Sequence, residues 1–335
     1  MTEAAHTIVR ALHGAALIHG VDPLVGSIHY RIFHPALFTN SAAERQTGIL
    51  SPLTDQAPWP VVVILGGINV NTDGYRWFAE RCAASGIAAV LYSHIGTITP
   101  GEVGLSPGID LDALRPDTFG TRPSCTTLAA LLEAIARENE TGRLAGLLDC
   151  TSIGLLGHSA GGTVALLNAN PEWFPGVAAV ASFAAHTMPA AILGHPEGTV
   201  LPVHPGVAAL ILNAGRDEVI EASIGRYVRA DGSNPTDHHP VLATFRHAVT
   251  AQGSALVTLR DARHLTLCDP VDTTTARGFL EGPDPHGAEH RDCIARLLLS
   301  FFGTQLQGPS AEPTNDPTAA CTQADRELIS DLELK

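Results

Sequence analysis

The sequence predicts an α/β protein with a mostly parallel central sheet that is flanked by helices on both faces. Short, apolar, β-branched runs recur along the chain, as expected for strands buried on both faces. Segments with helical spacing alternate with them, and glycines and prolines separate the two kinds. Such alternation is typical of parallel strands joined by right-handed crossovers. The expected buried strands are Val61–Leu65, Ile87–Tyr92, Ser152–Gly157, Val177–Phe183, Val207–Gly215 and Ala255–Leu259.

The first 60 residues predict strands and turns that precede this pattern. Ser27–Phe33 alternates loosely between polar and apolar residues and ends near Pro35, which suits a strand. Ser51–Pro60 is rich in proline and predicts a loop.

Helical spacing places the expected helices between the buried strands. In the first of them, Trp77, Phe78 and Cys82 share the inner face. Ser93–Arg122 has little periodicity and predicts a long Gly/Pro loop, a type of segment that is often functional. The expected helices are Asp73–Ala84, Thr126–Glu138, Gly162–Ala169, Val241–Ala251 and Asp292–Phe302.

The chain length and the composition along it predict one domain with a tail. With 335 residues, 45% of them hydrophobic, the chain can bury a large core. We expect a single domain over residues 1–303. Residues 304–335 are polar and acidic, with several prolines, and predict an extended or disordered tail.

The charge and the apolar runs bear on partners and location. The formal net charge is −14, with 20 Lys and Arg against 34 Asp and Glu, so a phosphate backbone would be repelled and no nucleic-acid partner is expected. No apolar run reaches the roughly 18 residues of a membrane-spanning helix. The N-terminus lacks the apolar core of an export signal, which favours a cytoplasmic protein acting on a small molecule; the sequence does not indicate an oligomeric state.

The sharpest motif is Gly157-His158-Ser159-Ala160-Gly161, which fits the G-x-S-x-G nucleophile elbow. It follows a buried strand and precedes a helix, as the elbow requires. The glycines let the chain cross itself in a tight, strained turn, and the Ser159 oxygen then projects above the sheet. The motif in this setting predicts the α/β-hydrolase fold with Ser159 as the nucleophile. His158 is interpreted as a packing residue, because its position directs it away from Ser159.

A serine hydroxyl needs a base, and the base needs an orienting carboxylate. In this fold the chain order is serine, acid, histidine. The strand Val207–Gly215 leads into Asp217, which is the expected acid, with Glu218 and Glu221 as fallbacks. His264 follows the last buried strand and is the expected base; among 16 histidines, this position selects it.

Backbone N–H groups should hold the oxyanion. Ala160, directly after the nucleophile, is one expected donor. Ile68, in the loop after Val61–Leu65, is the other, with Gly67 as the runner-up. We expect the substrate pocket to be lined by Gly67, Asn69, Phe183, His186 and Met188.

No metal or cofactor is predicted. The six cysteines form no CxxC pair and no zinc-finger array, so free or buried thiols are expected. His238 and His239 are adjacent, but they have no third ligand at fixed spacing and predict a solvated loop.

These motifs resemble the dienelactone-hydrolase-like α/β-hydrolases, in particular the branch of chlorophyllases, bacterial cutinases and polyester hydrolases, and platelet-activating-factor acetylhydrolase-like esterases. The similar stretches are residues 60–92 and 147–162, with the loops at 213–217 and 262–267. Together they span about 60–303, and the tail does not fit.

The resemblance implies ester hydrolysis through an acyl-enzyme, with Ser159, Asp217 and His264 as the triad and Ile68 and Ala160 as the oxyanion donors. The chain departs from these relatives at Gly66-Gly67, where many carry His-Gly or Pro-Gly, and over Glu218–Pro240, which is longer than in cutinases. Cutinase-like relatives carry a disulfide beyond the histidine, at places similar to Cys268 and Cys293; a reducing cytoplasm would disfavour it here.

The sequence therefore predicts a cofactor-free serine hydrolase of the carboxylesterase type. An amidase or lactonase with the same triad stays open, since pocket loops decide the leaving group. A non-catalytic ligand-binding protein of the same fold also stays open. Of the loops expected nearest Ser159, Gly66–Gly74 and Phe183–Gly206 carry no Lys or Arg, and only Arg216 and Arg263 lie close in sequence. We therefore expect a neutral or weakly cationic substrate with a sizeable apolar part, because burying an unpaired carboxylate is costly.

Overall fold

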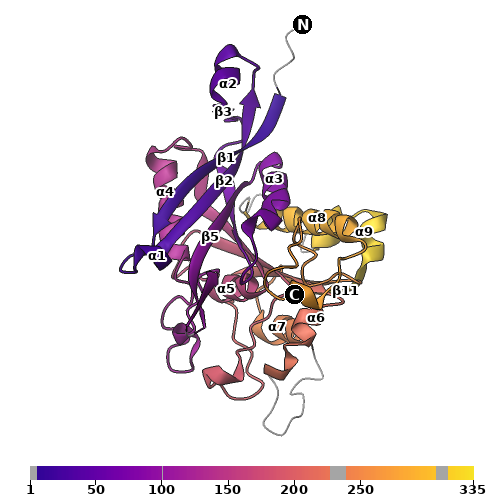
Figure 1. Cartoon of the computed structure of the whole chain (residues 1–335). Helices are drawn as coiled ribbons and strands as arrows, with labels where there is room; N and C mark the ends of the chain where they lie inside the picture. Colours follow the sequence, from indigo (N-terminus) through magenta and orange to yellow (C-terminus); the bar gives the residue numbers. More distant parts are fainter. Residues whose placement is uncertain (1–5, 100, 227–238, 307–315) are drawn as a thin grey trace.

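The structure, a computed structural model, describes residues 6–99, 101–226, 239–306 and 316–335. A mixed, mostly parallel sheet runs through the molecule in the order β1-β2-β5-β4-β7-β8-β9-β10-β11 (Figure 1). The predicted α/β fold is confirmed, and the arrangement is consistent with an α/β-hydrolase-like fold. The parallel strands are β4 (Trp59–Leu65), β5 (Ala88–Thr99), β7 (Leu148–His158), β8 (Val177–Phe183), β9 (Ala208–Ala214) and β10 (Ala255–Leu259).

Helices cover both faces of the sheet because its central strands are apolar on both sides. In β4, Val61, Val63 and Leu65 pack into one buried cluster, while Val62 and Ile64 pack into the other. The first cluster includes side chains of α4 (Leu128–Thr141), α5 (Ala160–Asn168) and α7 (Pro240–Ala248). The second includes side chains of α3 (Arg76–Ala84) and α8 (Gly287–Leu306).

A long antiparallel hairpin extends the sheet at the N-terminal side. Its strands are β1 (His6–Leu17) and β2 (Ser27–Phe38), with α1 (Pro23–Gly26) between them. The short elements α2 (Ala42–Thr47) and β3 (Ser51–Pro52) lie near its far end, which projects from the body (Figure 1). Strands and turns were expected here, and both are present.

The region expected as one long loop over Ser93–Arg122 is partly a hairpin. Strand β5 continues to Thr99 and pairs antiparallel with β6 (Glu102–Leu105). A short 3₁₀ helix, η2 (Asp112–Leu114), follows. The loop expectation is therefore wrong for the part up to Leu105, because a strand that leaves the parallel sheet can still pair with the returning chain.

The expectation of an extended or disordered tail is wrong for residues 316–335. The chain forms η6 (Pro317–Ala320), α9 (Gln323–Leu328) and β11 (Ile329–Leu334). Strand β11 pairs antiparallel with β10, and Arg296 of α8 binds Asp325 of α9 with an Nε–Oδ2 distance of 2.7 Å. Residues 307–315 of the expected tail lie outside the described residues.

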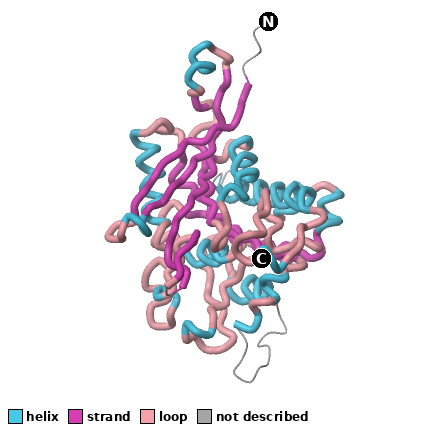
Figure 2. The backbone as a smooth tube through the Cα atoms, viewed as in Figure 1, coloured by secondary structure: helices cyan, strands magenta, loops and turns pink. Residues whose placement is uncertain are grey.

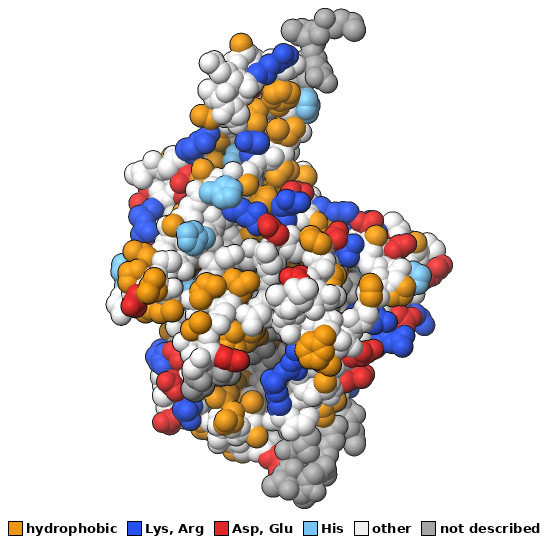
Figure 3. Space-filling model, viewed as in Figure 1, with side chains coloured by type: hydrophobic (Ala, Val, Ile, Leu, Met, Phe, Trp, Pro, Cys, Tyr) orange, Lys and Arg blue, Asp and Glu red, His pale blue; other side chains and the backbone are white. Residues whose placement is uncertain are grey.

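The six cysteines are all free thiols, so the bridge between Cys268 and Cys293 that the resemblance suggested is not formed. The Cys293 thiol lies instead 3.9 Å from the backbone oxygen of Asp325. Within the part of the chain that the structure describes, no helix is long and apolar enough to cross a membrane. On the face seen in Figure 3, acidic and basic side chains are interspersed with hydrophobic ones.

Candidate active site

The nucleophile turn joins β7 directly to α5. Ser159 has φ 54° and ψ −126°, a left-handed backbone conformation that a serine rarely adopts. The flanking glycines are required by space: a Cβ on Gly157 would lie 2.2 Å from the backbone oxygen of Gly161, and one on Gly161 would lie 2.2 Å from that of Leu65. The chain crosses itself here and against β4, which fixes the direction of Ser159.

His264 and Ser159 meet although they lie far apart in the sequence. The loop after β10 places His264 Nε2 2.9 Å from Ser159 Oγ. The second ring nitrogen, Nδ1, lies 2.8 Å from Asp217 Oδ2. A carboxylate only accepts, so Nδ1 carries the hydrogen and Nε2 is left to accept the serine proton.

Asp217 is fixed by the start of a short helix, α6 (Glu218–Glu221). Its Oδ1 accepts the backbone N–H of Ile220 at 2.7 Å, and the residue is 2% exposed. One carboxylate oxygen therefore caps α6 while the other holds His264. Between Asp217 and its fallbacks Glu218 and Glu221, the hydrogen bond of His264 identifies Asp217 as the partner.

His158, interpreted from sequence as a packing residue, is fully buried but also hydrogen-bonded at both ring nitrogens. Nε2 lies 2.8 Å from the backbone oxygen of His264, and Nδ1 lies 2.7 Å from Tyr75 Oη. The carbonyl can only accept, so Nε2–H donates to it and Nδ1 accepts from the Tyr75 hydroxyl. Burial, with a smaller contribution from His264, lowers the pKa of His158 to about 3, so this ring is neutral near pH 7.

Tyr75 extends this chain of hydrogen bonds to the loop after β4. Its Oη accepts the backbone N–H of Gly67 at 3.1 Å. The loop after β4, the nucleophile turn and the His264 loop are thus connected through Tyr75 and His158. Sequence reasoning missed Tyr75, because no spacing rule pairs it with a histidine 83 residues later.

The same hydrogen bonds distinguish between the two expected oxyanion donors of this loop. The N–H of Gly67 already donates to Tyr75, and that of Asn69 donates to the backbone oxygen of Leu105 at 2.9 Å. The N–H of Ile68, between them, takes part in none of the turn and loop hydrogen bonds of the described residues. Ile68 and Ala160 both line the cavity with Ser159, which favours Ile68 over Gly67.

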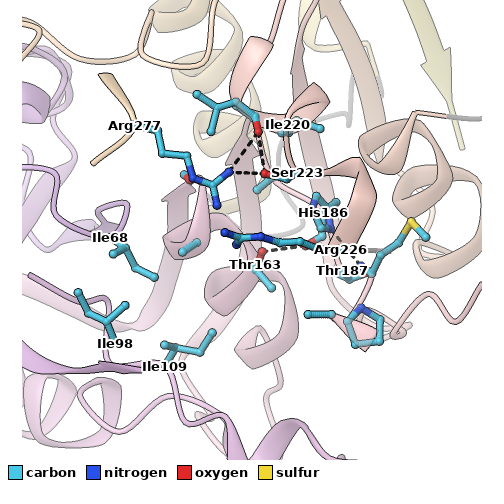
Figure 4. Close-up of a pocket in the computed structure, with 18 of the residues that line it drawn as sticks. Ile68, Ile98, Ile109, Thr163, His186, Thr187, Ile220, Ser223, Arg226 and Arg277 are labelled. Atoms are coloured by element: carbon cyan, nitrogen blue, oxygen red, sulfur yellow. Dashed lines mark hydrogen bonds between the residues drawn. The ribbon is translucent and has the colours of Figure 1, made fainter. Parts of the chain in front are cut away.

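Ser159 lines a cavity of about 560 Å³. Figure 4 shows other residues of its lining, among them Ile68, Thr163 and Arg277. Of the expected pocket residues, Asn69, His186 and Met188 line it. Gly67 and Phe183 do not. Gly67 lies behind Ile68 against Tyr75, and Phe183 is fully buried at the end of β8, where its ring centroid lies 6.0 Å from that of His158.

The apolar wall of the cavity comes from segments far apart in the chain. Part of it is a separate buried cluster of four leucines that line the cavity, Leu114, Leu167, Leu193 and Leu201. Figure 2 shows the loops gathering on this side of the molecule, below the long strands. Burial lowers the pKa of His186 to about 4, so this lining side chain is also neutral near pH 7.

Two arginines that the sequence did not indicate line the cavity. Arg226 ends the 3₁₀ turn η4 (Ile224–Arg226), and Arg277 begins the turn that leads into η5 (Gly278–Leu280). Arg277 donates to Ser223 Oγ and to the backbone oxygen of Val219 (Figure 4). Arg216 and Arg263, the two arginines expected near the site, do not line the cavity. The expectation that no other Lys or Arg lies near the site is therefore wrong.

Among the described residues, no three His, Cys, Asp or Glu side chains are grouped so that they could hold a metal ion. His239 is the residue before α7, and His238 lies outside the described residues. Comparison with known protein families found no model that matches the chain, and comparison with curated proteins found no matching relative.

Proposed function

We propose that this protein is a serine hydrolase of the α/β-hydrolase superfamily, similar to its dienelactone-hydrolase-like branch, that cleaves a carboxylic ester through an acyl-enzyme. One observation carries the proposal. Ser159, His264 and Asp217 form a continuous hydrogen-bond chain, with distances of 2.9 Å and 2.8 Å, at a strained strand-to-helix turn that opens into a cavity.

In the proposed reaction, each group of the site has a role. His264 Nε2 takes the Ser159 proton as Oγ attacks the ester carbonyl carbon, and the N–H groups of Ile68 and Ala160 bind the oxygen that becomes negative. The protonated Nε2 then gives its proton to the leaving alcohol oxygen. Water repeats the sequence on the acyl-enzyme and releases the acid. Asp217 stays ionised throughout and stabilises the imidazolium.

The cavity supports a substrate with a sizeable apolar part. Ile68, Ala160 and Met188 bring apolar surface close to the serine, and the buried leucine cluster extends it. Next to Ser159 we propose a neutral acyl group, because the apolar side chains that line the cavity would not replace the hydration of a buried carboxylate. Arg226 and Arg277 favour a second candidate, an ester with an anionic group at its outer end.

Activity-based labelling combined with a substrate panel tests the proposal. A fluorophosphonate probe should label the purified protein, and mass spectrometry should place the adduct on Ser159. Esters, lactones and amides with matched apolar groups should then be compared by kcat/KM, with esters turned over fastest. An adduct on another residue, or no labelling and no turnover, would contradict the proposed function. Faster turnover of an amide or lactone would reassign the leaving group while keeping the triad.

A further inference from the structure

A second buried carboxylate, Glu281, lies beside the proposed triad and takes no part in the proposed chemistry. It follows η5 and is 17 residues from His264 in the sequence. The residue is 7% exposed. Carboxylates are rarely buried this far unless several donors surround them, so the contacts of Glu281 need an account.

All three donors to Glu281 that the structure shows are backbone N–H groups of the two loops that carry the acid and the base. Oε1 accepts from Glu218 at 3.0 Å and from His264 itself at 3.1 Å. Oε2 accepts from Leu265 at 3.4 Å. Glu218 directly follows Asp217, so a single carboxylate oxygen joins the backbone beside the acid to the backbone of the base.

The joined loops follow two neighbouring strands, so their register depends on the contacts between them. Asp217 follows β9 and His264 follows β10, and the 2.8 Å contact between their side chains depends on both loops at once. The backbone N–H of Arg216 donates to the backbone oxygen of Ala262 at 2.9 Å, which fixes the near ends of the loops. Glu281 adds a further connection between the two loops, through the backbone N–H groups of Glu218 and His264.

The charge of Glu281 is held at a cost to folding. Burial raises the pKa of this carboxyl, with Asp217 adding to the rise and the N–H donors opposing it. The folded state therefore disfavours the ionised form relative to the unfolded chain. This cost is fully present above the raised pKa, decreases as the pH falls below it, and is gone below the ordinary pKa of a glutamate. Two titratable groups that face Glu281 are Asp217 and His264. The charged residues that line a small cavity together with Glu281 are Arg263, Asp269, Asp284, Glu289 and Arg291.

We propose that Glu281 is a positioning residue that holds the Asp217 and His264 loops in register for proton transfer from Ser159. The proposal rests on the proposed hydrolase function. Loss of the acceptor would leave three buried N–H groups without their partner and let the two loops separate, so His264 would meet Ser159 in the correct geometry less often. Small misplacements of this kind reduce turnover rather than substrate binding.

Two substitutions separate positioning from a general contribution to stability. Glu281→Ala removes the acceptor, and kcat for a neutral ester should fall about 10- to 100-fold while KM stays within about twofold. Glu281→Gln keeps a carbonyl oxygen for Glu218 and His264, so kcat should stay within about threefold of wild type. Because it also removes a costly buried charge, its Tm at pH 7 should equal or exceed that of the wild type.

Asp325→Asn is the matched control. Asp325 is also a buried carboxylate with several donors, but it lies on α9 and binds Arg296 and Thr322. This variant should lower Tm and leave kcat unchanged. All assays are run well below the Tm of each variant, so that the folded fraction is the same.

The outcomes are distinguishable from a failure of the proposed function. A wild-type protein with no turnover and no fluorophosphonate labelling would remove that function. An active wild type whose Glu281→Ala variant keeps full kcat would overturn the positioning role alone. A Glu281→Gln variant as impaired as Glu281→Ala would also overturn it, since the acceptor would then not be what matters.

Discussion

The catalytic corner, made of Ser159, Asp217 and His264, and the cavity rim, made of Ile192, Arg226 and Arg277, are built in opposite ways. In the corner, Asp217 and His264 are 2% and 5% exposed, and each side chain has a hydrogen-bonded partner on both sides. On the rim, Ile192 is 88% exposed and Arg226 ends a short 3₁₀ turn. Asp217 and His264 are thus held by hydrogen bonds on both sides, whereas the exposed Ile192 can change without disturbing them. Arg277 is intermediate, because it donates to Ser223 and Val219. If the proposed function holds, we expect the corner to determine the reaction and the rim to determine the choice of substrate.

Removing the nucleophile should have the largest effect. Ser159→Ala should lower kcat by roughly five to six orders of magnitude and abolish fluorophosphonate labelling, and His264→Ala should be nearly as damaging because the two act as a unit. Steady-state kinetics and gel labelling measure both. Ser182→Ala is the control, since Ser182 is also buried but lies within β8 with no hydrogen bond to its hydroxyl in the described structure. An effect of Ser182→Ala as large as that of Ser159→Ala would break the comparison.

Changing the acid should have the next largest effect. Asp217→Asn should keep the fold and lower kcat by about 10⁴-fold, because an amide can donate to Nδ1 and stabilise the wrong tautomer of His264. Glu218→Gln is the control, because Glu218 contacts Glu281 through its backbone N–H and its side chain should be dispensable. If Glu218→Gln proves more harmful, the acid has been assigned wrongly.

The hydrogen bonds behind the corner should matter less than the corner itself. Tyr75→Phe removes the hydroxyl between Gly67 and His158, and we expect kcat to fall about tenfold, with a loss of about 1–3 kcal/mol in unfolding free energy for the unpaired buried groups. Tyr92→Phe is the control, because its buried hydroxyl binds Pro107 away from the site. Comparable losses of kcat in both variants would mean that the corner does not depend on this connection.

Changes on the rim should have the smallest effect and should depend on the substrate. For a matched pair of esters, we expect a higher kcat/KM for the neutral ester than for the ester that carries a carboxylate. Arg226→Gln should widen that gap about three- to tenfold by slowing the anionic ester alone. Arg76→Gln, an exposed arginine on α3, controls for net charge. A wild-type preference for the anionic ester would show that the rim recognises anions and would favour the second candidate substrate.

The corner could be predicted from sequence because each of its residues follows a buried strand directly. Asp217 and His264 lie within a few residues of strand ends that apolar runs reveal, and the Ser159 turn carries its own glycines. Strand alternation also explains one wrong prediction. Ala179, Ala181 and Phe183 of β8 face the cluster under α3 and α8, so Phe183 points away from the cavity.

The supporting residues and the rim could not be predicted in this way. Tyr75 contacts the ring of His158, and Glu281 contacts backbone N–H groups of two separate segments, and no local pattern encodes such contacts. Arg226 and Arg277 reach the cavity from turns with no link to a strand end. Strand β11, with two acidic residues in six, resembles a surface segment until its pairing with β10 is known.

The pairing of β11 with β10 affects how the protein behaves at high concentration. Strand β10 contains Leu256, Val257 and Leu259, all fully buried, and without β11 one of its edges would offer open N–H and C=O groups beside apolar side chains. Such an edge recruits strands from other molecules and starts aggregation. Strand β11 closes it and ends the sheet with Asp331 and Glu333 instead. Asp331 is exposed at this edge, while Glu333 is bound by Arg246, and such charged side chains disfavour pairing with a strand of another molecule. Strand β11 therefore protects the core of the protein from edge-to-edge self-association.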